Sequence, residues 1–307
     1  MWRLRTADKV HISNNSGAGF VTHHRVPSLG FSATRRGAML MTVAALSACG
    51  GGGGGGDDGG SSVDRGPLAS TQGQVTSFTL KSDANGYAYA IQVFVPYSYA
   101  TGQFALPVIY ATESDAPYGT NRASRFDAFK DVLERRGTQA ILVGIGGTQR
   151  RATDFLFPGA ESYLRFITKE LVPAIDRQYR ADPKRRALSG LSHGGYFVVA
   201  ALVQEALAGV PLSFSHYLST ESSYGAHAGP ADYRQYVKQI DGKPLSATLF
   251  LAGALRGNGA AVVNDLYTQM AAQTNPGLTV IKATDFDTGH VQADVPAFES
   301  ALIRFFP

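Results

Sequence analysis

Cysteine is almost absent from this sequence of 307 residues, which contains only Cys49. A single cysteine excludes an intramolecular disulfide framework and a Cys-x-x-Cys metal site. The sequence also has no other metal-ligand spacing, no P-loop, and no dinucleotide-binding glycine fingerprint between a predicted strand and a helix. It therefore predicts neither a metal nor a cofactor.

Charge is scarce and unevenly placed. Only 17% of the residues are charged, and 28 Lys and Arg against 24 Asp and Glu give a net charge of +4. Residues 1–48 hold six of these cations and one of the anions, a net charge of +5. Residues 49–307 keep 22 cations and 23 anions, a net charge of −1. The basic character belongs to the N-terminal segment, so nucleic acid is not expected as a partner.

Long apolar runs are missing too, because none reaches the ~18–20 residues of a membrane-spanning helix. A short apolar run over residues 38–48 follows Arg35 and Arg36 and ends in Leu-Ser-Ala before Cys49. A charged segment, a short apolar stretch and small residues are typical of a secretory signal peptide. The ending resembles a bacterial lipobox, in which the cysteine is lipidated, so Cys49 is the expected lipid attachment site. The arginine pair loosely resembles a twin-arginine signal, and the export route stays open.

A glycine tract, Gly50–Gly56, follows the cysteine at once. Such a tract buries too little surface to order itself, which predicts a flexible tether. We therefore expect a signal peptide over 1–48, a lipidated cysteine with its tether over 49–70, and one folded domain over 71–307. This organisation predicts a lipid-anchored protein of a bacterial cell envelope, at the periplasmic face or in the outer membrane.

Beyond residue 70, short apolar runs alternate with amphipathic segments. The pair Asn85-Gly86 predicts the turn of an antiparallel hairpin, and Glu161–Tyr179 has apolar residues at helical spacing. We expect strands at 75–80, 87–95, 106–111, 139–144, 186–188, 212–218, 247–252 and 278–283, and helices at 122–136, 161–179, 199–207, 260–272 and 295–306. This alternation predicts an α/β fold with a doubly wound, mostly parallel sheet and helices on both faces.

A Gly-x-Ser-x-Gly motif centred on Ser192 lies between the predicted strand 186–188 and the helix after it. A sharp strand-to-helix turn exposes the serine hydroxyl, and the flanking glycines let neighbouring backbone approach. The N-terminus of the following helix offers an N–H and a partial positive charge to a developing oxyanion. Ser192 is therefore the candidate nucleophile.

A nucleophilic serine needs a base, and residues 49–307 contain four histidines. His290 lies 98 residues after Ser192, between the last predicted strand and the last helix, which is the position this architecture requires. His193 follows the nucleophile directly and offers its backbone N–H instead. His216 is expected to pack within a strand, and His227 lies in a polar loop.

Longer stretches of the chain resemble a known family. The segments that carry the resemblance are Thr153-Asp154-Phe155, Pro158–Ile167, Glu170–Pro173, Tyr179-Arg180 and Arg186–Gly195. They run in the order found in the "putative esterase" family of α/β-hydrolases, which includes esterase D-like enzymes, trilactone siderophore esterases, feruloyl esterase modules and mycolyltransferases. The resemblance covers about residues 75–307 and is strongest to the siderophore-esterase branch. It implies an α/β-hydrolase fold with no large lid.

The resemblance also implies roles for individual residues. Ser192 is the expected nucleophile and His290 the general base and acid, acting on a small-molecule ester. The backbone N–H of His193 and one near Glu113 and Ser114, which we place at Ser114, are the expected oxyanion donors.

The acid partner of the base is less clear from the sequence. The family commonly places a carboxylate a few residues past the strand at 247–252, but here Arg256 occupies that position. Glu221, after the predicted strand 212–218, is the first choice. Asp265, Asp285 and Asp287 stay as alternatives, and so does a Ser-His dyad without a carboxylate.

The sequence indicates few residues that could contact the substrate. Arg150 and Arg151 follow the predicted strand 139–144, where they either bind an anionic or catecholate-like substrate or face solvent. Tyr118, Tyr196 and Tyr224 either line an apolar or aryl pocket or pack in the core.

Three functions are compatible with these patterns. The first is an envelope serine esterase for a siderophore trilactone, an aryl ester or a short-acyl ester. The second is an acyltransferase of the same fold, in which an alcohol replaces water. The third is a catalytically impaired binding protein, which the missing family acid favours. The sequence is silent on the oligomeric state.

Overall fold

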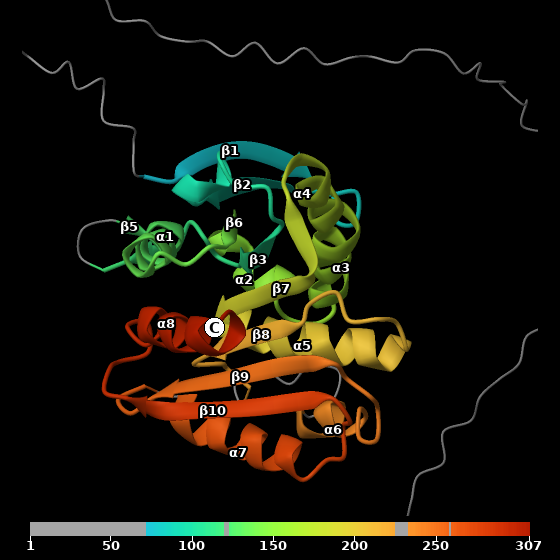
Figure 1. Ribbon diagram of the computed structural model, residues 1–307. Helices are drawn as coiled ribbons and strands as arrows, with labels where there is room; N and C mark the ends of the chain where they lie inside the picture. Colours follow the sequence, from blue (N-terminus) through green and yellow to red (C-terminus); the bar gives the residue numbers. More distant parts are fainter. Residues whose placement is uncertain (1–71, 120–122, 225–232, 258) are drawn as a thin grey trace, which may run out of the picture. The chain divides into compact units, whose positions relative to one another are not determined.

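The folded domain is built on an eight-stranded sheet, shown in the computed structural model of Figure 1. The structure describes residues 72–119, 123–224, 233–257 and 259–307. The predicted signal peptide, Cys49 and the tether lie outside the described residues, as does His227. The strands of the sheet are β1 (Gln74–Lys81), β2 (Ala88–Val95), β3 (Leu106–Ala111), β6 (Ile141–Ile145), β7 (Ala181–Leu191), β8 (His216–Thr220), β9 (Ala247–Ala254) and β10 (Leu278–Phe286).

The strand order is β1-β2-β6-β3-β7-β8-β9-β10. β1 and β2 form the predicted antiparallel hairpin, with Gly86 at a φ of 77° in its turn. β2 also runs antiparallel to β6, whereas the neighbouring strands from β6 to β10 all pair in parallel. The prediction of a mostly parallel sheet is therefore confirmed.

Side chains alternate between two cores, one on each face of the sheet. In β3, Val108 and Tyr110 join one core, whereas Ile109 and Ala111 join the other. Successive residues of a strand point to opposite faces, so an apolar run without interruption is the mark of a strand covered on both sides. The fold is thus doubly wound, as predicted.

Helices cover both faces. Phe129 of α1 (Arg125–Arg136) stacks on Phe298 of α8 (Asp294–Phe305) at 3.7 Å between ring centroids, and these two helices cover one face. Figure 1 shows α1 and α8 on the same side of the sheet. The core of the other face takes in residues of α3 (Gly159–Arg165), α4 (Val172–Gln178), α5 (His193–Ala208), α6 (Tyr233–Lys238) and α7 (Gly259–Ala271). The short α2 (Arg151–Asp154) follows β6 along the chain.

Helix α5 is apolar on nearly all sides. Its residues from Gly194 to Val203 are all buried. A helix of this kind belongs to a protein core rather than a surface. Truncating one of its large side chains, such as Phe197, costs about 3–5 kcal/mol in such a setting. The residue just before α5, Ser192, is therefore held on a rigid element.

Some elements differ from the predicted ones. The predicted helix 161–179 is interrupted by a π-helical turn, Phe166–Leu171, between α3 and α4. Pro173 has no N–H for the carbonyl of Lys169, which favours this change of hydrogen-bond register. β7 is longer than predicted, and β8 begins only at His216. Helix α6 and the two-residue strands β4 (Pro117–Tyr118) and β5 (Ala123–Ser124) were not predicted.

Among the described residues, no helix combines the length and the apolar character needed to cross a membrane.

Candidate active site

The carboxyl ends of the parallel strands bring several polar residues to one edge of the sheet. Glu113 follows β3, Ser192 follows β7 and Glu221 follows β8. All three have a positive φ, between 47° and 59°, which is uncommon for residues other than glycine. Backbone strain of this kind gathers at functional sites, and it marks this edge of the sheet as the candidate site.

Ser192 occupies the tight turn between β7 and α5, with a φ of 59° and a ψ of −113°. Its N–H donates to the carbonyl of Thr220 on the neighbouring strand, at 2.9 Å. A Cβ on Gly190 would lie 2.2 Å from the carbonyl oxygen of Gly194, and one on Gly195 would lie 2.7 Å from that of Thr220. The motif glycines are therefore required by close backbone contacts, as the pattern predicts.

His290 and Glu221 are joined by a hydrogen bond beside this turn. The His290 Nδ1 lies 2.8 Å from the Glu221 Oε2, although 69 residues separate them in sequence. This contact places the proton of the imidazole on Nδ1 and leaves Nε2 as an acceptor. The Glu221 carboxylate is buried and also accepts hydrogen bonds from the N–H groups of Ala254 and Gly259.

Burial alone would raise the pKa of the Glu221 carboxyl. The hydrogen bond to His290 and those from the Ala254 and Gly259 N–H groups outweigh this effect, so its pKa lies below the ordinary value. The side chain is therefore a carboxylate at neutral pH. Space for it depends on glycine, because a Cβ on Gly257 would lie 2.2 Å from Glu221 Oε2.

A pocket of about 210 Å³ opens over this edge, and both Ser192 and His290 line it. Its lining includes the charged residues Glu113, Arg125 and Arg151. It also includes the apolar and aromatic residues Ala116, Pro117, Tyr118 and Val291. A pocket with a few placed polar groups among apolar ones suits a small organic ligand.

Glu113 is a buried carboxyl in the lining of this pocket. Its Oε1 lies 3.1 Å from the Arg151 Nε. Burial raises the pKa of Glu113 to about 7, and the nearby Arg151 and Arg125 cations offset part of that rise. This carboxyl therefore changes its protonation state near neutral pH.

One predicted oxyanion donor is wrong. The Ser114 N–H donates to the carbonyl of Ile145, at 3.0 Å, and continues the pairing between β3 and β6. It is therefore not available to a substrate. The N–H groups of Glu113 and Asp115 donate to no other residue that the structure describes. His193 is the first residue of α5, where N–H groups lie at the positive end of the helix dipole.

The other candidate acids do not reach His290. Asp265 pairs with Arg234 at 2.8 Å on the exposed side of α7, and Asp285 is exposed on β10. Asp287 pairs with Arg256 at 3.3 Å on the surface. The position where the family places its acid is thus occupied by an exposed cation, and Glu221 supplies the carboxylate at His290 from the neighbouring strand end.

The two arginines that follow β6 have different surroundings. Arg150 makes a bidentate contact with Asp154, at 2.9 and 2.7 Å, and lies over the ring of Tyr87. Arg151 lines the pocket and contacts Glu113. Of the pair, only Arg151 is placed to meet a ligand in this pocket.

The three tyrosines separate in the same way. Tyr118 lines the pocket. Tyr196 and Tyr224 are buried and pack against Tyr233, with ring centroids 5.5 and 4.4 Å away. They belong to the core rather than to the pocket. His216, the expected packed histidine, lies beside Phe305 at the start of β8, where burial lowers its pKa to about 4.

Two site residues have no counterpart in the sequence analysis. Arg125 and Asp294 both line the pocket, and they form a buried ion pair with 2.6 Å between Arg125 Nε and Asp294 Oδ2. Each begins a helix, so in the sequence they look like ordinary charged residues at helix ends. Their burial depends on contacts over 169 positions, which no local pattern carries.

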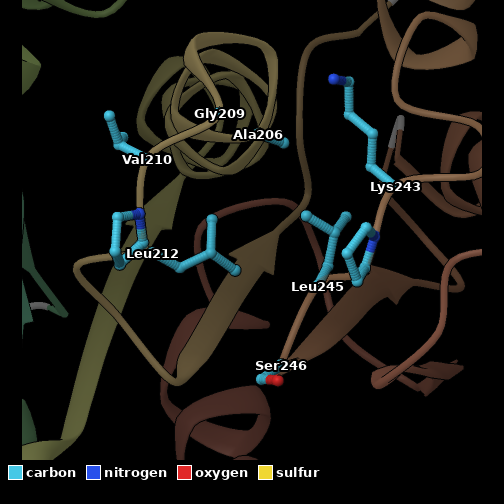
Figure 2. Close-up of a pocket in the computed structure, with 9 residues that line it drawn as sticks. Ala206, Gly209, Val210, Leu212, Lys243, Leu245 and Ser246 are labelled. Atoms are coloured by element: carbon cyan, nitrogen blue, oxygen red, sulfur yellow. The ribbon is translucent and has the colours of Figure 1, made fainter.

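A larger cavity, of about 490 Å³, lies at the opposite end of the strands (Figure 2). Leu212 and Leu245, from the segments before β8 and β9, approach it from two sides, and Lys243 lies at its rim. Its lining contains neither a histidine nor a carboxylate, so it lacks the imidazole-carboxylate pair found at the first pocket. Among the described residues, no cluster of His, Cys, Asp and Glu has the arrangement of a metal site.

The parallel sheet, the strained serine between strand and helix, and the imidazole-carboxylate pair define the α/β-hydrolase class. The model of the family described as "Putative esterase" matches residues 82–240, about half of the chain. The protein belongs to this family, which confirms the predicted relationship. It is a carboxylic ester hydrolase.

Individual relatives agree with this assignment. The chain is 26% identical over 234 residues to the ferri-bacillibactin esterase BesA of Bacillus subtilis, covering 65% of this chain and 78% of that protein. The structure of a BES protein from Bacillus cereus superposes with a TM-score of 0.63 at 18% identity, over 80% of this chain and 99% of that one. The siderophore hydrolase EstB of Aspergillus nidulans gives a TM-score of 0.62 at 19% identity, over 78% and 97%. These structures share the α/β-hydrolase fold with this chain.

Proposed function

We propose that the protein hydrolyses its ester through an acyl-enzyme on Ser192, with His290 as base and Glu221 as the acid that orients it. The observation that carries this proposal is the contact of 2.8 Å between His290 Nδ1 and Glu221 Oε2, beside a pocket that His290 shares with Ser192. With Nδ1–H held by the carboxylate, Nε2 is free of its proton and directed to act as a base.

The reaction has two halves. His290 Nε2 takes the proton of the Ser192 hydroxyl while the oxygen attacks the ester carbonyl. The tetrahedral intermediate collapses, the C–O bond of the ester breaks, and His290 returns the proton to the leaving alcohol. Water then attacks the acyl-Ser192 ester while His290 takes its proton. The C–O bond to Ser192 breaks, His290 returns the proton to the serine oxygen, and the carboxylic acid product is released. The Glu221 carboxylate stabilises the imidazolium in both halves.

Negative charge develops on the carbonyl oxygen of the substrate in each tetrahedral intermediate. The His193 N–H and the positive end of α5 are one source of stabilisation. Because the Ser114 N–H is occupied, we assign the second donor to the preceding or following amide of the same loop, that of Glu113 or Asp115.

The substrate we favour is a siderophore-type ester, with aryl and short-acyl esters as simpler substrates. One relative is named a ferri-bacillibactin esterase, from Bacillus subtilis, and another is named a siderophore hydrolase, from Aspergillus nidulans. The pocket agrees with such a ligand, since its lining includes the cation of Arg151 and the aromatic ring of Tyr118.

A fluorophosphonate probe and an ester panel test the proposal. The probe should label the wild type and leave Ser192→Ala unlabelled, and hydrolysis of trilactone, feruloyl, aryl and short-acyl esters should follow the same pattern. Transfer of the acyl group to an added alcohol in preference to water would make the protein an acyltransferase. A folded wild type that neither labels nor hydrolyses any ester would support the binding protein. The binding protein was favoured by the absence of a carboxylate at the position where the family places it. The hydrogen bond between Glu221 and His290 weakens that reason.

We further propose that the enzyme is anchored in the cell envelope by a lipid on Cys49. The support is the lipobox-like ending at Cys49 and the tether after it. Cys49→Ser should move the protein from the membrane fraction to the soluble fraction. If the Cys49→Ser protein stays in the membrane fraction, the anchor proposal is wrong.

A further inference from the structure

The buried ion pair of Arg125 and Asp294 contacts the three segments that carry the nucleophile, the base and the proposed oxyanion donors after β3. We infer that Arg125, together with Asp294, is a positioning residue. It holds the nucleophile, the base and the oxyanion loop, which is the loop after β3 that carries Glu113 and Asp115, in one arrangement. This inference rests on the function proposed for Ser192 and His290.

The guanidinium of Arg125 makes four hydrogen bonds in three directions. Its Nε and Nη2 donate to the two carboxylate oxygens of Asp294, at 2.6 and 3.1 Å. Nη1 donates to the carbonyl of Thr112 at 2.6 Å, and Nη2 also donates to the Ser189 hydroxyl at 3.0 Å. The ring of Phe129 packs against the guanidinium, 4.4 Å from its carbon atom. Four of the five N–H groups are thus used within the protein, which argues against a main role in binding substrate.

Each partner belongs to a different part of the site. Thr112 directly precedes Glu113 in the oxyanion loop after β3. Ser189 lies on β7, three residues before Ser192. Asp294 begins α8, four residues after His290. A single side chain therefore joins the three segments that must be in register for catalysis.

The backbone at the start of α1 adds two more contacts to the same loop. The Arg125 N–H donates to the carbonyl of Ala116 at 2.8 Å, and the Phe126 N–H donates to that of Ser114 at 3.0 Å. On the other side of the pair, the Asp294 N–H donates to the carbonyl of Val291 at 3.2 Å, within the loop that carries His290. The loop with the oxyanion donors is thus tied to the start of α1, and the loop with the base is tied to Asp294.

Stability alone is a weak reason for such a pair. The side chains of Arg125 and Asp294 are only 2% and 0% exposed, so both charges lose their hydration. Apolar residues of similar size often replace a buried ion pair with no loss of stability, whereas removing one partner leaves a costly unpaired charge. Apolar side chains cannot, however, join these three segments with directed hydrogen bonds. Beyond packing, the pair therefore supplies directed hydrogen bonds that fix the relative positions of these three segments.

This difference between charge balance and geometry makes the inference testable. We would compare Arg125→Met, Asp294→Leu and the double variant by thermal unfolding, by kcat and KM on an ester that the wild type hydrolyses, and by the rate of fluorophosphonate labelling. Each single variant should lose stability. The double variant should recover most of it, yet keep a kcat and a labelling rate about 10- to 100-fold below the wild type with little change in KM. A double variant with wild-type kcat would overturn the inference.

Arg125→Lys covers the case in which the double variant fails to fold. Lysine keeps the charge beside Asp294, but its donors all lie on one nitrogen and cannot reproduce the planar spread of the guanidinium toward Asp294, Thr112 and Ser189. The variant should stay folded, with kcat lowered about 10-fold. Wild-type kcat in folded Arg125→Lys would also overturn the inference.

Two further proteins complete the experiment. Arg186→Met removes a partly exposed ion pair to Asp176, at 2.6 Å, from the middle of β7 and serves as the control. It should lose stability without any change in kcat, and an equal fall in kcat would show that the effect at Arg125 is general loosening. Ser192→Ala separates the two levels of the argument: if it keeps its activity, the proposed mechanism fails and this inference fails with it, whereas an active Arg125→Met/Asp294→Leu protein overturns the positioning role alone.

Discussion

The two cavities at opposite ends of the strands differ in size and in chemistry. The one before β8 and β9 measures about 490 Å³ and is lined mostly by apolar residues (Figure 2). The one after β3 and β7 measures only about 210 Å³ but contains Ser192 and His290. Volume therefore does not locate the site. In a parallel sheet, loops at the carboxyl ends of strands face one another, and helix N-termini point to the same edge.

Among the variants that test the contrast between the two cavities, Ser192→Ala should have the largest effect on activity. Without the nucleophile no acyl-enzyme forms, and we expect kcat for ester hydrolysis to fall by about 10⁴-fold or more. Steady-state kinetics on an aryl ester measure this, with circular dichroism to show that the variant is folded. A loss of less than about tenfold would mean that the chemistry takes place elsewhere.

Glu221→Gln should have the next largest effect. The amide keeps the shape but not the charge that holds the Nδ1 proton of His290 and stabilises the imidazolium. We expect kcat to fall by about 10²- to 10⁴-fold. The matched control is Asp287→Asn, a carboxyl near His290 in sequence that pairs with Arg256 on the surface. Equal losses in the two variants would argue against Glu221 as the acid.

Glu113→Gln should change how stability depends on pH. The pKa of Glu113 is about 7 in the folded protein, mainly because burial raises it, and near the ordinary value of 4.5 in the unfolded chain. Between these values the folded state binds more protons than the unfolded state, so the contribution of Glu113 to the free energy of unfolding decreases as pH rises. The Glu113→Gln variant lacks this decrease with pH. Relative to the wild type, its free energy of unfolding should therefore increase by on the order of 1–3 kcal/mol between pH 4.5 and pH 8.

Chemical denaturation at pH 5 and pH 8 checks this prediction. Only the change of the stability difference with pH is informative, because the variant also alters the contact with Arg151 by a constant amount. A difference that is the same at both pH values would contradict a raised pKa at Glu113.

The smallest effect on activity is expected at the other cavity. Leu245 is buried beside it, so Leu245→Ala should lower the free energy of unfolding by about 2–4 kcal/mol. At a temperature where the variant is folded, kcat and KM should equal those of the wild type. A selective rise in KM would show that the larger cavity takes part in substrate binding, and the contrast between the two cavities would fail.

Local patterns were sufficient for most of the fold. The predicted strand 106–111 agrees with β3 at both ends, because its apolar residues serve two cores and leave no other arrangement. Details were missed where the backbone rather than the side-chain pattern decides, as at the π-helical turn that interrupts the predicted helix 161–179 before Pro173. The start of β8 was missed in a similar way, since Leu212 packs beside the larger cavity instead of joining the strand.

The residues of the candidate site likewise fall into those that local patterns predict and those that only long-range contacts reveal. The sequence by itself determined the strand-serine-helix turn at Ser192 and the loop of His290, because a glycine motif and a position between two elements are local properties. Only the tertiary structure decided that Glu221, and not Asp265, Asp285 or Asp287, contacts the imidazole.

The tertiary structure also decided which polar groups meet in the pocket. In the folded protein the Ser114 N–H donates a hydrogen bond to the carbonyl of Ile145. Arg125 and Asp294 form an ion pair although 169 positions separate them in the sequence. The physical reason is common to these cases. Which strand ends become neighbours depends on the order of strands in the sheet, and hydrogen-bond partners so far apart in the chain leave no trace in its local spacing.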